Sequence, residues 1–221
     1  MITTEEIKAV YQRRAGIYDL STRLYPFIGF RFEAYRRVGI EQLRLRPGDC
    51  VVDLGCGTGL NFQPLLERVG PRGKIIGVDN APRMLRQAEK RIAAAGWNNI
   101  ELRVSPMETF VFPEDVKGIF SSGALGFTPD PEALLCRAAR ALPEAGNLVI
   151  VDLKRPEKWP GWLFHLYFVL LGKAFAVTPD YVRGQPWKSV EALFASSSYA
   201  ERYGGAVYIA SGRNPLPRDT A

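Results

Sequence analysis

The chain has 221 residues, of which 47% are hydrophobic, and a formal net charge of +6 at neutral pH. That length suits one domain with a substantial core, and the charged N-terminal residues argue against a signal peptide. The three cysteines, Cys50, Cys56 and Cys136, lack paired spacing and argue against a disulfide framework, while a single histidine argues against a metal site. Composition therefore favours one domain in a reducing, cytoplasmic compartment.

Basic residues outnumber acidic residues in the first 48 residues and again after residue 154. Such a surplus can bind nucleic acid or an anionic membrane surface, or it can simply form a solvated face. The sequence contains no run of Lys or Arg and no RNA-binding motif, so we do not expect a nucleic-acid partner. A solvated basic face is the simplest interpretation, and peripheral contact with the inner face of the membrane is the alternative.

The predicted elements begin with a helical pattern over residues 3–43, interrupted near Pro26 and Gly29. After it, short apolar runs alternate with amphipathic segments, which predicts parallel strands joined by helices. The predicted strands are 51–54, 74–78, 100–104, 118–122 and 147–152, and the predicted helices are 60–69, 82–95 and 131–142. Two later runs, 199–202 and 206–211, flank Gly204-Gly205 and predict an antiparallel hairpin. We therefore expect an α/β fold.

Residues 154–197 lie between the last parallel strand and the hairpin and form an aromatic insertion. Within it, residues 162–172 contain one strongly polar side chain, that of His165. This run is too short to cross a bilayer, which needs about twenty apolar residues. Three interpretations are open: a core helix on the sheet, a cap over a hydrophobic substrate, or an interfacial element with Trp159 and Trp162 at the level of the lipid headgroups.

The most specific motif follows the first predicted strand, where residues 51–54 (VVDL) lead into the loop GCGTG. Glycines at alternate positions, Gly55, Gly57 and Gly59, let the backbone turn sharply and approach a ligand closely. The second strand leads to Asp79, at the spacing that suits two vicinal ribose hydroxyls. The loop has neither the G-x-G-x-x-G spacing of dinucleotide enzymes nor the Lys-Ser/Thr pair of a phosphate-binding loop. Together these features indicate a nucleoside cofactor.

This G-x-G-x-G loop after V-D-L resembles the first motif of the class I S-adenosylmethionine (SAM) methyltransferases. Nearer the N-terminus, Tyr11-x-x-x-Ala15-x-x-Tyr18-Asp19 resembles the entry motif of the ubiquinone/menaquinone C-methyltransferases and the bacterial phosphatidylethanolamine N-methyltransferases. The resemblance implies SAM as cofactor and S-adenosylhomocysteine (SAH) as product. It implies one domain over residues 1–221, with a Rossmann-like, seven-stranded, mostly parallel sheet, a C-terminal antiparallel hairpin and helices on both faces. It also implies that residues 1–46 form a helical lid, in which Tyr18 closes on the methionine part of the cofactor.

Ligands of open α/β sheets bind beyond the carboxyl ends of the strands, so the residues there are candidates for cofactor binding. We expect Asn61 to lie beneath the amino-acid part of the cofactor and Asp79 to accept from both ribose hydroxyls, with capping of the next helix as the alternative for Asp79. Where related enzymes have G-D-A, with the Asp contacting the adenine amino group, this chain has Pro106, so Glu108 or a backbone carbonyl would supply that contact. The full predicted set is Tyr18, Asp53, Gly55, Cys56, Gly57, Thr58, Gly59, Asn61, Asp79, Asn80, Met84, Met107, Glu108, Ser122, Gly123 and Leu125.

Methyl transfer from SAM requires mainly the alignment of a nucleophile with the S–CH₃ bond, because the sulfonium methyl group is already activated. A general base is needed only for a protonated nucleophile, and the candidates are His165, Asp152 and Tyr18. Residues 125–127 (LGF) stand where related enzymes often have L-H-H, which removes one polar group from the site.

The leading prediction is methyl transfer to a small hydrophobic or amphiphilic acceptor, for which a phospholipid amine such as phosphatidylethanolamine suits the aromatic insertion and the basic ends. A second prediction is C- or O-methylation of a quinone or polyketide-like ring among Trp159, Trp162, Phe164 and Tyr167. The stretch GCGTGLNF also resembles thiol methyltransferases, which keeps S-methylation open. From a different class, the chain could bind SAM and regulate a partner without turnover.

Overall fold

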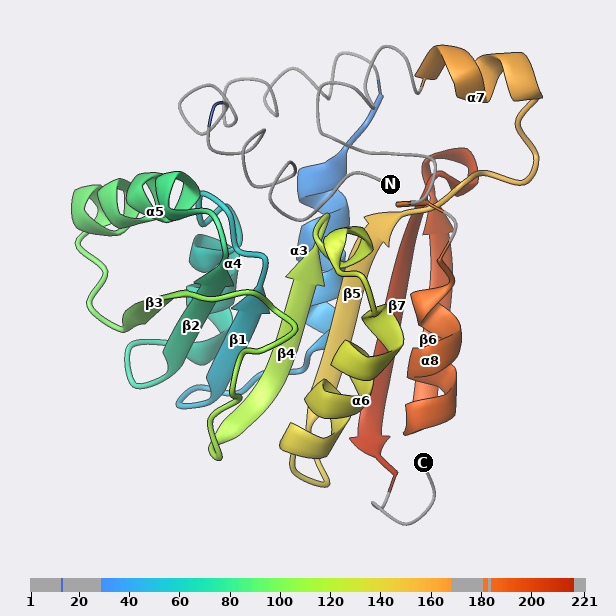
Figure 1. Ribbon diagram of the computed structural model, residues 1–221. Helices are drawn as coiled ribbons and strands as arrows, with labels where there is room; N and C mark the ends of the chain where they lie inside the picture. The colour runs from blue at the N-terminus through green and yellow to red at the C-terminus, as the bar shows by residue number, and fades with distance from the viewer. Residues whose placement is uncertain (1–12, 14–28, 168–180, 183, 217–221) are drawn as a thin grey trace.

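A seven-stranded sheet forms the centre of the fold in the computed structural model, which describes Arg13 and residues 29–167, 181–182 and 184–216 (Figure 1). The strands are β1 (Cys50–Leu54), β2 (Lys74–Asp79), β3 (Ile100–Val104), β4 (Val116–Ser122), β5 (Asn147–Leu153), β6 (Phe194–Arg202) and β7 (Val207–Pro215). They stand in the order β3-β2-β1-β4-β5-β7-β6. Strands β1 to β5 pair in parallel, and β7 runs antiparallel to both β5 and β6. This topology confirms the predicted Rossmann-like sheet.

Helices cover both faces of the sheet, and alternate residues of each strand contact opposite layers. Helices α3 (Phe32–Gln42), α4 (Phe62–Val69) and α5 (Pro82–Ala95) pack on one face, and α6 (Pro131–Ala141) and α8 (Pro186–Leu193) pack on the other. In β1, Val51 packs in the core on the side of α3, α4 and α5, and Val52 packs in the core on the side of α6 and α8. Both are completely buried, which explains why the sequence shows a continuous apolar run there and not an alternating pattern.

The C-terminal hairpin is longer than the sequence indicates. Its turn is the short 3₁₀ helix η5 (Tyr203–Gly205), which contains the two predicted glycines. Strand β6, however, begins at Phe194, so its first residues fall inside the segment 154–197 that we expected to be an insertion. The first part of β6 was not predicted because residues 196–198 are all serines. A polar stretch at the sheet edge shows no alternation of apolar and polar residues.

The parallel strands β1, β2, β4 and β5 end along the same edge of the sheet, the upper edge in Figure 1. Helix α7 (Gly161–Tyr167) and the 3₁₀ turn η2 (Leu125–Phe127) lie beyond that edge. In the segment 154–197, Trp162 of α7 is 70% exposed, whereas α8 buries Val190 and Leu193 against the sheet. Among the helices of the described segments, none is long and apolar enough to cross a membrane.

Helix α3 belongs to the core layer although it falls within the predicted lid, residues 1–46. Ile40 and Leu43 are buried against the sheet, and a Cβ added at Gly39 would lie 2.5 Å from Val151 Cγ2, so the helix lies very close to the strands. Only part of the predicted lid is therefore placed, and that part packs as a core helix. Residues 1–12 and 14–28, Tyr18 among them, lie outside the described residues.

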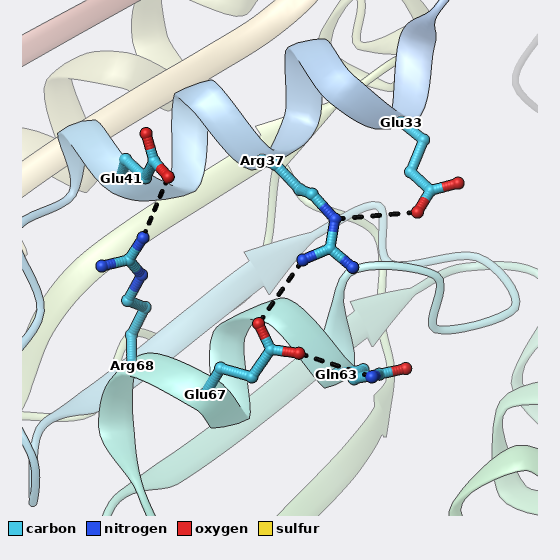
Figure 2. Close-up of polar contacts among 6 residues, drawn as sticks. All are labelled: Glu33, Arg37, Glu41, Gln63, Glu67 and Arg68. Carbon is cyan, nitrogen blue, oxygen red and sulfur yellow. Dashed lines mark hydrogen bonds and ion pairs between the residues drawn. The ribbon is translucent and has the colours of Figure 1, made fainter.

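Side chains on the exposed surfaces of α3 and α4 join the two helices (Figure 2). Arg37 of α3 pairs with Glu67 of α4 at 3.4 Å, and Arg68 of α4 pairs with Glu41 of α3 at 3.1 Å. These four side chains are 44–61% exposed, so each pair is worth little in water. Burial of the apolar side chains holds α3 in place, and the ion pairs add to its orientation.

Candidate functional site

A cleft opens at the carboxyl ends of β1, β2 and β4, and it encloses about 850 Å³ of empty space including its open mouth. Most of the predicted set lines it: Gly55, Cys56, Gly57, Thr58, Asn61, Asp79, Asn80, Met84, Met107, Glu108, Ser122 and Gly123. Six further residues line the cleft without having been predicted: Phe32, Arg36, Leu60, Ala81, Ala124 and Phe127. The cleft therefore lies where the topology of an open sheet places a ligand, between β1 and β4 and beside β2.

The glycine loop after β1 forms the floor of the cleft. The N–H groups of Gly55 and Cys56 both donate to the Val78 carbonyl, at 2.8 and 3.0 Å, so the loop is tied to the end of β2. Gly55 has φ of +70° and Gly57 has φ of +56°, values that L side chains rarely adopt. A Cβ at Gly55 would lie 2.2 Å from Ala124 Cβ across the cleft. The loop thus brings bare backbone to the surface that a ligand would contact.

Gly59 is the one glycine of this loop that does not line the cleft. A Cβ there would lie 2.4 Å from the ring of Phe62, the first residue of α4. This glycine allows α4 to pack closely on the loop, and so it shapes the site from behind.

Asp79 connects the glycine loop to the start of α5. Its Oδ2 accepts from Gly57 N at 2.9 Å and its Oδ1 accepts from Ala81 N at 2.8 Å. Burial raises the pKa of Asp79, and the two N–H donors oppose the rise. Because a carboxylate offers about four acceptor positions, each oxygen can still receive a hydroxyl from the cleft. Both predicted roles, contact with a ligand and support of the helix start, are therefore compatible.

Asn61 carries the clearest unmet hydrogen-bonding capacity in the cleft. Its Nδ2 donates to both oxygens of Asp53 and to Ser122 Oγ, all at 3.1 Å. Its Oδ1 is buried and finds no partner among the described residues. A buried acceptor without a donor is costly, so a ligand that supplies an N–H here would be stabilised.

Asp53 lies behind the cleft and does not line it. The side chain is completely buried, and burial raises the pKa of Asp53 to about 7, while the Asn61 bond and the nearby Arg36 charge oppose that rise. Its contact with Asn61 makes it a support for the residue that faces the ligand.

The side of the cleft formed by β2, α5 and the loop after β3 carries Asn80, Met84, Met107 and Glu108. Pro106, at the position where related enzymes were expected to have an acid, is exposed and does not line the cleft. Glu108, two residues later, does line it and is half-buried. This is the carboxylate that the loop offers to a ligand.

The opposite side of the cleft is aromatic and carries one cation. Phe32 and Arg36 come from α3, with Arg36 Cζ 5.7 Å from the centre of the Phe32 ring, and Phe127 comes from η2. Phe127 contacts the ring of Tyr181 edge-on, at 4.6 Å between ring centres. The sequence placed Phe127 in the loop after the fourth strand. The resemblance placed residues 1–46, which include α3, over the cofactor, but it did not single out Phe32 or Arg36.

Asp152, predicted as a general base, sits at the end of β5 and is 1% exposed. Its carboxylate accepts from Leu125 N at 3.0 Å, from Gly126 N and from the Tyr181 hydroxyl, and it does not line the cleft. Burial raises the pKa of Asp152 to about 6, against the effect of these donors. Asp152 thereby fixes the η2 turn that carries Phe127. Leu125, predicted as a cofactor contact, is fully buried in the same turn.

The structure does not describe the side chains of the other two predicted bases, His165 and Tyr18. His165 belongs to helix α7, but its side chain lies outside what the structure describes, and so does the whole of Tyr18.

Comparisons with known proteins agree with this geometry. Residues 51–146 match the family model described as a methyltransferase domain. The chain is 28% identical over 183 residues to the demethylmenaquinone methyltransferase of Listeria monocytogenes serotype 4a (strain HCC23), a match that covers 78% of this chain and 74% of that protein. It is 36% identical over 139 residues to the aklanonic acid methyltransferase of Streptomyces sp. (strain C5), covering 61% and 62%. A solved structure of a SAM dependent methyltransferase from Aquifex aeolicus has the same fold, with a TM-score of 0.56 at 19% identity, over 81% of this chain and 89% of that one.

Proposed function

We propose that this chain, a class I SAM-dependent methyltransferase, transfers the methyl group of SAM to a ring carbon or ring oxygen of a quinone-like or other aromatic acceptor. The methyltransferase domain and the relatives named above confirm the predicted enzyme class and cofactor. The observation that carries the acceptor class is the composition of the cleft: the glycine loop and Asp79 form one part of it, and the rings of Phe32 and Phe127 form another.

In this proposal, each part of SAM is assigned to residues of the cleft. Asp79 would accept from the ribose hydroxyls, and the bare backbone at Gly57 leaves room for the cofactor beside it. Asn61 Oδ1, which has no partner among the described residues, would accept from the ammonium of the methionine part, and this contact would satisfy the buried oxygen. Met84 and Met107 would flank the adenine ring, since thioether sulfurs pack well against aromatic rings.

The acceptor would lie on the side of Phe32 and Phe127. Two phenylalanine rings favour a planar aromatic ligand, because offset and edge-on ring contacts add to the burial of apolar area. Arg36 lies among them as the basic side chain of the described cleft lining, and it would orient an acidic hydroxyl or carbonyl oxygen of the acceptor. The names of the relatives support this choice, since they refer to a demethylated menaquinone and to aklanonic acid.

In the reaction, SAM supplies a methyl group already activated by its sulfonium charge. The protein must bring the acceptor atom into line with it and keep water out, and orientation of this kind can contribute on the order of 7–11 kcal/mol in the best cases. The positive charge of Arg36 would favour ionisation of a ring hydroxyl, which makes a phenol or hydroquinone more nucleophilic. We keep His165 and Tyr18 as candidate bases, and we assign Asp152 to support of η2 because its carboxylate is enclosed by donors.

The phospholipid amine preferred from the sequence gains no support from these observations, and neither does peripheral membrane contact. The relatives favour a ring acceptor, which was the second prediction. The non-catalytic regulatory module is set aside, because the methyltransferase domain and relatives establish the enzyme class.

The proposal is tested by incubating the protein with SAM that carries a tritiated methyl group and four acceptors. These are a 2-demethylated naphthoquinol, an aromatic polyketide acid, an alkyl thiol, and phosphatidylethanolamine in vesicles. We expect label in the naphthoquinol or the polyketide acid, and a tenfold or greater loss in a Phe127→Ala variant. Label only in the thiol or in phosphatidylethanolamine would contradict the acceptor class while leaving the enzyme class intact.

A further inference from the structure

Arg137 reaches from a helix outside the cleft to the loop that forms one of its sides. It lies on α6, and no residue of α6 is among those that line the cleft. Its Nη1 donates to the Glu108 carbonyl and its Nη2 donates to the Phe110 carbonyl. One guanidinium thus holds two backbone positions of the same loop, through charge-assisted hydrogen bonds.

The loop between β3 and β4 is held at both ends and contains a turn between them. Ser105 N donates to the Asp79 carbonyl at 3.1 Å, which continues the pairing of β3 with β2. Phe110 is 7% exposed and anchors the far end in the core. Between these points the chain turns, with Thr109 N donating to the Pro106 carbonyl at 3.3 Å, and the cleft-facing Glu108 lies in this turn.

We propose that Arg137 is a positioning residue, which fixes the loop so that the Glu108 carboxylate recognises the exocyclic amino group of adenine. This inference rests on the proposed function, since it deepens the description of the cofactor site. A carboxylate accepts from an amino group but repels the oxo group of a hypoxanthine ring, so the position of Glu108 decides which purine is bound. Glu108 lies in a turn and the nearby Pro106 is exposed, so the backbone at residue 108 needs a contact that holds it. The hydrogen bond from Arg137 to the Glu108 carbonyl provides that contact.

Only arginine suits the contact. Its planar, rigid group presents donors in a fixed arrangement to two carbonyls at once, whereas the compact ammonium of lysine acts as a point charge. Arg140, one turn further along α6, is exposed and provides a matched control. A change at Arg140 removes the same charge from the same helix without touching the loop.

The test measures, by calorimetry, the dissociation constants of SAH and of S-inosylhomocysteine, its 6-oxo analogue, for the full chain. For the wild type we expect SAH to bind at least about tenfold more tightly, as suits one hydrogen bond to a charged group. In Arg137→Met and in Arg137→Lys we expect this ratio to fall below about threefold. Arg140→Met should keep the wild-type ratio.

A second variant keeps the inference testable if Arg137→Met does not fold. Glu108→Gln alters a half-buried side chain and should also bring the ratio close to one, because an amide can pair with either purine. An unchanged ratio in a folded Arg137→Met or in Glu108→Gln would overturn the inference, even if the melting temperature falls. Failure of the wild type to bind either nucleoside would instead overturn the proposed function, and this inference with it.

Discussion

At the scale of single residues, Asp79 connects three parts of the site, the glycine loop, the end of β2 and the start of α5, through two hydrogen bonds of 2.8 and 2.9 Å. Asp79→Ala removes those bonds together with the proposed contacts to the ribose. We expect SAM binding to weaken at least about tenfold, as measured by equilibrium dialysis with labelled SAM.

Asp130 provides the control for Asp79. It caps α6, where its side chain accepts from Ala133 N at 2.9 Å, and it does not line the cleft. Asp130→Ala should cost about 1 kcal/mol of stability and leave SAM affinity unchanged. Equal affinity for SAM in the wild type and in Asp79→Ala would mean that the ribose site is misplaced.

A substitution at Gly55 tests how closely the glycine loop and Ala124 approach each other. Gly55→Ala places a Cβ 2.2 Å from Ala124 Cβ, on a backbone with φ of +70°. Gly96 has nearly the same φ, +68°, but nothing lies within 4 Å of an added Cβ, so Gly96→Ala reports backbone strain alone. We expect Gly96→Ala to cost about 1–2 kcal/mol and Gly55→Ala about 1–3 kcal/mol more, with loss of SAH binding only in the latter. Urea unfolding and calorimetry measure the two effects, and equal costs would argue against the packing seen here.

Asp53 makes the stability of the protein depend on pH. Its pKa is raised from 3.8 in the unfolded chain to about 7 in the fold, so the folded state keeps a proton that the unfolded state loses. The contribution of this group to the free energy of unfolding is therefore fully present below about pH 4. It is lost as the pH rises towards about 7, and it does not change further above that pH. Asp53→Asn removes this dependence.

Relative to the wild type, Asp53→Asn should therefore gain stability between pH 5 and pH 7.5. The gain is at most about 2–3 kcal/mol, because each pH unit between the two pKa values contributes about 1.4 kcal/mol. Asp152 acts in the same direction but is present in both proteins, so its contribution cancels. Urea unfolding at the two pH values checks the sign, and a variant that loses stability relative to the wild type as the pH rises would contradict it.

At the scale of elements, α3 is held by apolar packing far more than by its ion pairs with α4 (Figure 2). Ile40 is 1% exposed, so Ile40→Ala should cost about 2–5 kcal/mol through lost contacts and a cavity. Glu41→Gln with Glu67→Gln removes both inter-helix pairs and should cost less than about 1 kcal/mol, since these side chains are exposed. Urea unfolding measures the free energy of unfolding of both variants. A larger loss of stability in the charge variant than in Ile40→Ala would contradict the claim that apolar packing holds α3.

Elements that carry a strong local signal were predictable from the sequence. Helix α5 was predicted with its observed ends, and Pro82 supported its start. The structure shows that Gly96 adopts the left-handed conformation that ends the helix. Strand β3 was predicted equally well. Only the second part of β6, residues 199–202, was predicted, because the serines before it show no apolar alternation. Helix α8 was not predicted, because a short helix beside an aromatic stretch has no distinct periodicity.

At the scale of the whole molecule, the sheet order explains which site residues could be predicted. The carboxyl ends of β1, β2 and β4 meet at one edge, so the motif residues Gly55, Asn61 and Asp79 could be assigned to one site from the sequence alone. Phe32 and Arg36 fall within the predicted lid, but they could not be singled out, because no motif marks the side of α3 that reaches the cleft. Asp53 and Leu125, which were predicted to contact the cofactor, are fully buried and do not line the cleft.

The central claim, that this cleft binds SAM for methyl transfer, is tested most directly by calorimetric titration of the wild-type protein with SAM and with SAH. We expect both to bind at one site with micromolar dissociation constants, and SAH to displace SAM. Absence of binding by either nucleoside to the folded protein would contradict the claim.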